Sequence, residues 1–131
     1  MLQRYSFIII GLFGITAVAL GAFGAHAWRA TLTARGSLQV WETAVTYQFI
    51  HTLALLTLVL CRPTLRDGKV SLFPWTVRFW MAGVVLFSGS LYVLALGGPS
   101  FFGPITPLGG LAFILGWGSL IIEARSLSKT R

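Results

Sequence analysis

Residues 6–27 read SFIIIGLFGITAVALGAFGAHA and contain no Asp, Glu, Lys or Arg. A helix needs roughly 17–25 mainly apolar residues to cross about 30 Å of hydrocarbon, and this run has that length. Three further apolar runs follow in the chain, at about 44–61, 77–96 and 106–123. The sequence therefore predicts an all-α membrane protein in which four transmembrane helices form a bundle.

The composition agrees with lipid as the main solvent of the chain. Hydrophobic residues make up 56% of it and charged residues 10%, whereas a soluble domain carries about 25% charged residues. So few charges cannot cover the surface of a soluble protein. The length of 131 residues is short for more than one domain, so we expect residues 1–131 to form a single four-helix domain.

The first run has a second interpretation. Arg4, the apolar stretch after it and Ala25-His26-Ala27 resemble a secretory signal peptide that ends at a small-residue cleavage site. The apolar stretch, however, is longer than the roughly 7–15 residues of a signal peptide. We therefore favour a retained first helix.

The charges predict the orientation. The formal charge of +7 comes from Lys and Arg in short segments between the apolar runs, where orientation signals occur, rather than along one exposed face as in nucleic-acid-binding proteins. Four crossings place both termini and the second loop on one side, which holds Arg4, Arg62, Arg66, Lys69, Arg78, Arg125, Lys129 and Arg131. The other side holds Arg29 and Arg35. Because cationic loops resist translocation, both termini should be cytoplasmic, and we expect no nucleic-acid partner.

Small residues mark two candidate packing faces. Lipid removes the hydrophobic drive for helix association, so helices pack where small side chains let two backbones approach closely. On the first run these residues are Gly14, Ala17, Gly21 and Ala25. On the fourth run they are Gly109, Ala112, Gly116 and Ser119. We expect these stripes to hold the bundle together, or else to contact a second copy or a partner membrane protein.

Polar side chains in the outer half of the bundle form the candidate site, because ionisable groups inside a bilayer are costly and therefore informative. The cluster consists of His26, Glu42, Tyr47, Gln48, His51, Ser88, Ser90 and Tyr92. With a rise of about 1.5 Å per residue, His51 lies about 10–13 Å below the outer start of its helix. His26 and Glu42 lie at the outer margin, where we expect them to face each other across the first hairpin.

Two interpretations of this cluster stay open, namely hydrogen bonding between helices and binding of a small or lipidic ligand. A haem would need His26 and His51 at one iron, but their depths differ by about 10 Å. The single cysteine, Cys61, excludes a metal cluster built on cysteines. We therefore expect no cofactor and no metal. A hydrolase that pairs Ser88 or Ser90 with His51 is conceivable, but the sequence contains no nucleophile elbow.

Four ordered blocks of sequence resemble a known family. They read LGAFGAH at 20–26, WETAV at 41–45, FSGSLY at 87–92 and PITPLGG at 104–110. Together they resemble domain of unknown function 423, a family of bacterial inner-membrane proteins with a eukaryotic branch. The resemblance extends over nearly the whole chain and implies a four-helix protein of a bacterial inner membrane. It implies no activity.

We therefore predict a non-enzymatic multi-pass membrane protein whose outer polar cluster is structural or binds a small or lipidic ligand. Membrane lipids are the expected partners. Two alternatives remain from other classes. One is a membrane enzyme acting on a lipid or quinone, with His51 as base and Tyr92 or a serine as the reacting group. The other is an accessory subunit of a larger membrane complex.

Overall fold

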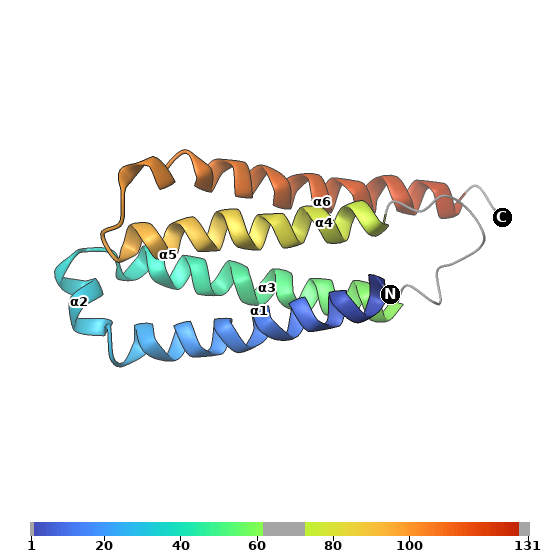
Figure 1. Ribbon diagram of the computed structural model, residues 1–131. Helices are drawn as coiled ribbons and strands as arrows, with labels where there is room; N and C mark the ends of the chain where they lie inside the picture. The colour runs from blue at the N-terminus through green and yellow to red at the C-terminus, as the bar shows by residue number, and fades with distance from the viewer. Residues whose placement is uncertain (1, 62–72, 129–131) are drawn as a thin grey trace.

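A computed structural model of the chain describes residues 2–61 and 73–128, and in these ranges the protein is helical without strands. Three long helices are α1 (Leu2–Ala25), α3 (Leu38–Cys61) and α6 (Ile105–Ser128). A fourth long segment consists of α4 (Phe73–Gly83), the π-helical turn η1 (Val84–Ser88) and α5 (Gly89–Ala95). Two short helices, α2 (Arg29–Ala34) and the 3-10 turn η2 (Ser100–Phe102), lie in the connections. Figure 1 shows the four long segments running antiparallel.

Four stretches of the described chain are long and apolar enough to cross a membrane: Arg4–Ala25, Leu38–Cys61, Phe73–Ala95 and Ser100–Arg125. They confirm the predicted four-helix membrane fold. The second span begins at Leu38, well before the apolar run expected at 44–61. Polar residues such as Gln39 and Glu42 extend this helix, because a helix does not need to end where its apolar stretch ends.

The first connection contains the short helix α2. Leu32 on α2 is completely buried against the bundle. Gly36 closes α2 with φ +66°, a left-handed conformation that glycine adopts without steric cost. The next residue, Ser37, donates its hydroxyl to the carbonyl oxygen of Ala95 at 2.7 Å. This bond ties the first hairpin to the end of α5.

The long helices pack in a row, with α1 on α3, α3 on the α4–α5 segment and that segment on α6 (Figure 1). Side chains join α3 to α6 across the row, since the His51 and Phe113 rings stack with centroids 3.5 Å apart. The apolar core follows the same line and includes Leu55, Trp80 and Val84. In the described part of the chain, α1 and α4 do not pack closely on each other.

The small residues of α6 form a packing face, as expected. A Cβ at Gly109 would overlap the backbone of Phe87, and a Cβ at Gly116 would overlap the Trp80 ring. Ala112 is 9% exposed between them. The close approach at Gly116 leaves the indole N–H of Trp80 buried without an acceptor among the described residues. Tight ring-on-backbone packing is therefore favoured here over a further hydrogen bond.

The expected stripe on α1 is only half right. Ala17 is completely buried, and a Cβ at Gly21 would touch Val45 at 3.4 Å. Ala25, however, is exposed, and a Cβ at Gly14 would meet no atom within 4 Å. Gly24 takes the place expected for Ala25, under the Trp41 ring. Each residue turns a helix by about 100°, so Gly24, seven residues after Ala17, points within about 20° of the direction of Ala17. Ala25, eight residues after Ala17, points about 80° away and therefore lies on another face.

Both ends of the bundle can be compared with the predicted orientation. The start of α1 and the end of α6 lie at one end, here named the terminal end, while α2 and η2 lie at the opposite hairpin end (Figure 1). The described cations at the terminal end are Arg4, Arg78 and Arg125, and those at the hairpin end are Arg29 and Arg35. The remaining expected cations, Arg62, Arg66, Lys69, Lys129 and Arg131, lie outside the described residues. Cytoplasmic termini therefore stay a prediction.

Replacement of Gly109 by alanine should lower the free energy of unfolding by about 1–3 kcal/mol, because the backbone of Phe87 cannot move aside as a side chain can. Gly118 on the same helix provides a matched control, since a Cβ there meets nothing within 4 Å. Gly118→Ala should be neutral or stabilise by up to about 1 kcal/mol through helix propensity. Unfolding in mixed detergent measures both. Equal effects of the two substitutions would contradict the packing described.

The orientation can be tested with a membrane-impermeant maleimide. In a Cys61→Ser background, Thr33→Cys places the only thiol of the chain on α2 at the hairpin end. This thiol should be labelled in intact cells or right-side-out vesicles, because the positive-inside rule places the hairpin end outside. Labelling of Thr33→Cys only after the membrane is opened would contradict the predicted orientation and place the hairpin end in the cytoplasm.

Candidate functional site

Gln48 is the centre of the polar cluster. Its side chain is 3% exposed, and its Nε2 donates to the carbonyl oxygen of Phe13 and to Thr16 Oγ1, both at 2.8 Å. Its Oε1 accepts a hydrogen bond from Tyr92 Oη at 2.8 Å. One amide on α3 thus connects α1 with α5. Both N–H donors of the amide are used, and its oxygen has a partner.

His51 lies one turn further along the same helix and is 4% exposed. Its Nδ1 lies 2.9 Å from the carbonyl oxygen of Tyr47, and its Nε2 accepts a hydrogen bond from Trp117 Nε1 at 3.2 Å. These partners fit a neutral imidazole that carries its proton on Nδ1, an assignment that follows from the hydrogen-bond roles. The Nε2 lone pair therefore points at an indole N–H. It is not free to bind iron or to accept a proton from a substrate.

The two serines of the cluster bond to the protein rather than to His51. Ser88 Oγ donates to the carbonyl oxygen of Ala44 at 2.8 Å and so joins η1 to α3. Ser90 Oγ lies 2.7 Å from Thr106 Oγ1 and so joins α5 to α6. In the described structure neither serine shares a hydrogen bond with the histidine, so the nucleophile–base pair considered from the sequence is not formed.

Two of the expected cluster residues lie elsewhere, and a third, Tyr47, lies at the edge of the cluster with its ring stacked beside His51, centroids 6.0 Å apart. His26 and Glu42 are exposed at the hairpin end, and no hydrogen bond or ion pair joins them in the described structure. Tyr47 is 40% exposed, and its ring packs on Phe87 with centroids 4.7 Å apart. The expected pairing of His26 with Glu42 is therefore not observed.

Trp41 explains why Glu42 faces outward. The Trp41 side chain is 1% exposed and fills the space between α1 and α3, where its Nε1 donates to the carbonyl oxygen of Leu20 at 2.9 Å. Its ring also meets the edge of Tyr92 with centroids 4.7 Å apart. Adjacent residues on a helix point about 100° apart, so the residue after a buried tryptophan turns towards the surface.

Sequence reasoning missed several polar members of the helix contacts. Thr16, Thr106 and Trp117 complete the bonds of Gln48, Ser90 and His51. A second polar contact lies near the terminal end, where Thr76 and Ser119 share a hydrogen bond of 2.6 Å, and Glu123 is 7% exposed on the next turn of α6. The sequence offered one signal for these contacts. Trp117 lies in the middle of an apolar run, whereas indole rings usually lie at the membrane interface, and this unusual position indicates a polar partner inside the bundle.

Metal-binding geometry is not present in the described residues. They contain no group of three or more His, Cys, Asp or Glu side chains able to hold an ion. The buried cluster around Gln48 and His51 consists of amide, imidazole, hydroxyl and indole groups that bond to one another or to backbone carbonyl oxygens. Chemically, this arrangement is suited to interhelical hydrogen bonding.

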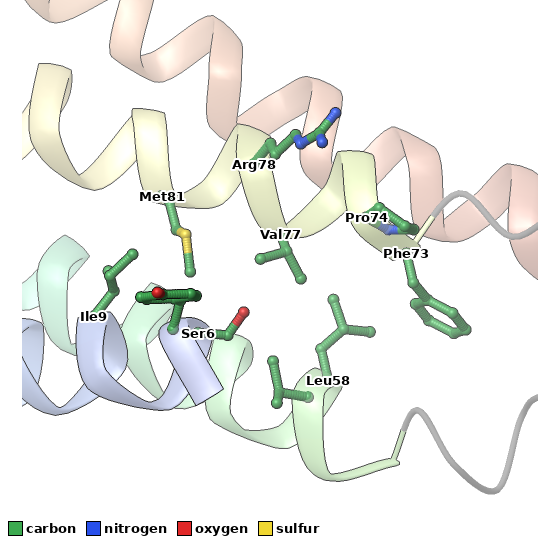
Figure 2. A pocket seen from close by; sticks show the side chains of 10 residues that line it. Ser6, Ile9, Leu58, Phe73, Pro74, Val77, Arg78 and Met81 are labelled. Atoms are coloured by element: carbon green, nitrogen blue, oxygen red, sulfur yellow. The ribbon is translucent and has the colours of Figure 1, made fainter. Parts of the chain in front are cut away.

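Two adjoining cavities lie away from Gln48 and His51, while a separate one is lined by Trp80 and Trp117, the partner of His51. A pocket of about 170 Å³ lies near the terminal end, between α1, α3 and α4, and Tyr5, Ser6 and Arg78 are among its lining residues. Figure 2 shows this pocket from close by. It adjoins a purely apolar groove of about 560 Å³ between α1 and the α4–η1 segment, lined by Ile9, Leu12, Phe13, Met81, Ala82, Val85 and Leu86. Ile9 and Met81 line both spaces, which we name together the α1–α4 groove. Neither space reaches Gln48 or His51.

Four apolar helices joined by buried interhelical hydrogen bonds define a small multi-pass α-helical membrane protein. The chain belongs to the family described as "Protein of unknown function (DUF423)", which matches residues 20–110. This confirms the family resemblance found in the sequence blocks.

Similar proteins occur in several bacteria. The chain is 42% identical to "UPF0382 membrane protein YwdK" of Bacillus subtilis over 90% of this chain and 94% of that protein. It is 46% identical to "UPF0382 membrane protein SSP2132" of Staphylococcus saprophyticus over 88% and 93%. It is 38% identical to "UPF0382 inner membrane protein YgdD" of Escherichia coli over 98% and 95%. No solved structure matches the chain significantly.

Replacement of Gln48 by leucine should lower the free energy of unfolding in detergent by about 1–2 kcal/mol. The substitution removes three hydrogen bonds and leaves the Tyr92 hydroxyl without its acceptor, while a single interhelical bond is worth about 0.6 kcal/mol on average. Gln39→Leu is the matched control, because Gln39 is exposed on the same helix. Equal stability of wild type and Gln48→Leu would contradict the role of the Gln48 hydrogen bonds in stabilising the bundle.

Proposed function

We propose that this protein is a non-enzymatic membrane protein in which the Gln48–His51 cluster holds the helices together and the α1–α4 groove binds an acyl chain of a membrane lipid. One contrast carries the proposal. The buried polar groups of the cluster have partners within the protein, whereas the larger part of the α1–α4 groove is apolar and unfilled by side chains. A ligand would thus bind in the groove and not at the polar cluster.

The state of the cluster argues against the enzyme alternative. A base needs a lone pair directed at its substrate, but the Nε2 lone pair of His51 is engaged by Trp117. The other candidate reacting groups are engaged as well, since Tyr92 donates to Gln48 and Ser88 donates to the carbonyl oxygen of Ala44. Chemistry at this cluster would require bonds between three helices to break first.

The groove is suited to a lipid chain because of its position and its walls. It lies between two helices that do not pack closely on each other. An unfilled apolar space forfeits dispersion contacts along its walls, and in a bilayer the flexible apolar material available to fill it is an acyl chain. Membrane lipids are therefore the partners that we propose.

The membrane in question is, in our proposal, a bacterial inner membrane with the terminal end on the cytoplasmic side. One relative, YgdD of Escherichia coli, is named an inner membrane protein. The distribution of Lys and Arg along the chain favours cytoplasmic termini by the positive-inside rule. With this orientation, the pocket near Tyr5 and Arg78 lies in the cytoplasmic leaflet.

Filling the groove should abolish lipid binding. Ala82 is exposed and lines the apolar part of the groove, so Ala82→Trp should occupy the space of an acyl chain. The control is Ala22→Trp, the same substitution at an exposed position of α1 outside the groove. Thermal unfolding in detergent should shift upward on addition of phospholipid for wild type and Ala22→Trp, because a ligand of the folded state stabilises it. A similar shift for Ala82→Trp would contradict the proposal.

A further inference from the structure

The two parts of the α1–α4 groove differ in chemistry. Near the terminal end, its walls include the side chains of Tyr5, Ser6 and Arg78. Further along, the walls are entirely apolar. Figure 2 shows Val77 and Met81 directed from α4 towards α1 and α3, whereas the side chain of Arg78 extends from α4 away from α1. A polar mouth that leads into an apolar channel matches the shape of a phospholipid, which has a polar headgroup above its acyl chains.

Arg78 lies near the terminal end of α4. It lies five residues after Phe73, the start of α4, or about 7–8 Å along the helix. Side chains on a helix lean towards its N-terminus, and the guanidinium of Arg78 accordingly lies 5.1 Å from the Trp75 ring centre. Trp75 is 52% exposed, and exposed indole rings in membrane proteins mark the interfacial region. The guanidinium is thus held beside an exposed indole ring near the terminal end of α4.

Among the described residues, no carboxylate lies against the charge of Arg78. In the described part of the chain, the Trp75 ring is the only charge-directed contact of the guanidinium, and no carboxylate pairs with it. An arginine within a spanning helix is costly without an anion, and a guanidinium binds phosphate oxygens in a bidentate manner. Arg4 adds positive charge at the same end. The phosphate of a lipid that has no compensating ammonium group, and is therefore anionic, fits these positive charges best.

The groove is also long enough for most of an acyl chain. Its walls on α1 extend from Tyr5 to Phe13, which corresponds to a rise of about 12 Å. One leaflet contributes about 15 Å of hydrocarbon. A chain that starts from a headgroup at Arg78 would therefore run along the groove towards the bilayer midplane.

Resting on the lipid binding proposed above, we infer that the α1–α4 groove is selective for an anionic phospholipid. The Arg78 guanidinium binds the headgroup phosphate, and one acyl chain follows the groove past Met81 and Ala82. Selectivity arises at the polar mouth, and the apolar channel contributes affinity for any lipid.

Dioleoyl phosphatidylglycerol and dioleoyl phosphatidylethanolamine test this inference, because they share acyl chains and differ in net charge. Binding to the purified full chain in detergent is followed by native mass spectrometry and by thermal unfolding. Wild type should bind the anionic lipid about tenfold more tightly, a difference typical of one charge-assisted contact. Arg78→Gln should lose about tenfold in affinity for phosphatidylglycerol and leave phosphatidylethanolamine unchanged.

Two control variants complete the experiment. Arg78→Lys keeps the charge and should retain a preference for the anionic lipid, which separates the charge from any effect of Arg78→Gln on folding. Arg29→Gln removes an exposed arginine at the hairpin end and should behave as wild type.

The outcomes separate the two proposals. Equal affinity of wild type for both lipids, with binding abolished by Ala82→Trp, overturns the headgroup selectivity and supports the acyl-chain groove. A preference for phosphatidylglycerol that persists in Arg78→Gln overturns the assignment to Arg78. Absence of binding by either lipid overturns both the selectivity and the proposed lipid-binding function.

Discussion

The structure depends on the amide of Gln48 more than on any other single group. Lipid does not drive helices together as water does, so a membrane bundle is held by packing and by hydrogen bonds between its helices. The Gln48 amide forms such bonds to α1 at Phe13 and Thr16, and it accepts one from Tyr92 on α5. Because these bonds all come from one residue, the rotation of α3 about its own axis determines where both α1 and α5 lie. His51, one turn away, fixes α6 in the same manner through Trp117.

A second constraint, the packing of rings on glycine backbone, accompanies these bonds. Cβ atoms at Gly24, Gly83 and Gly116 would each overlap a ring, of Trp41, Phe113 and Trp80 respectively. Large rings seated on bare backbone give close packing where no hydrophobic effect acts. The same contacts draw α1 to α3 and α4 to α6, and so they leave α1 and α4 apart. The α1–α4 groove is thus a consequence of how the two helix pairs are built, and its apolar walls follow from its position in the hydrocarbon.

Part of the candidate site could be predicted from the sequence. Gln48, His51 and Ser88 are buried as expected, because a polar residue in the middle of a spanning helix finds partners on neighbouring helices more readily than in lipid. The prediction failed for His26 and Glu42, which lie near helix ends. At that depth a polar side chain can reach water, so burial is no longer required. The rotation imposed by Trp41 then decides that Glu42 faces outward.

The sequence by itself determined that the chain spans a membrane four times. That conclusion needs only the length and polarity of each segment, since bilayer thickness sets the number of apolar residues in a crossing. The depth predicted for His51, about 10–13 Å from the start of its helix, was wrong, because α3 begins at Leu38 and His51 lies about 20 Å along it. The tertiary structure alone decided which polar groups meet, that the lone pair of His51 is occupied, and that an apolar groove lies between α1 and α4. The physical reason is that partners and cavities depend on the rotation and spacing of whole helices, which are set by contacts between residues far apart in the chain.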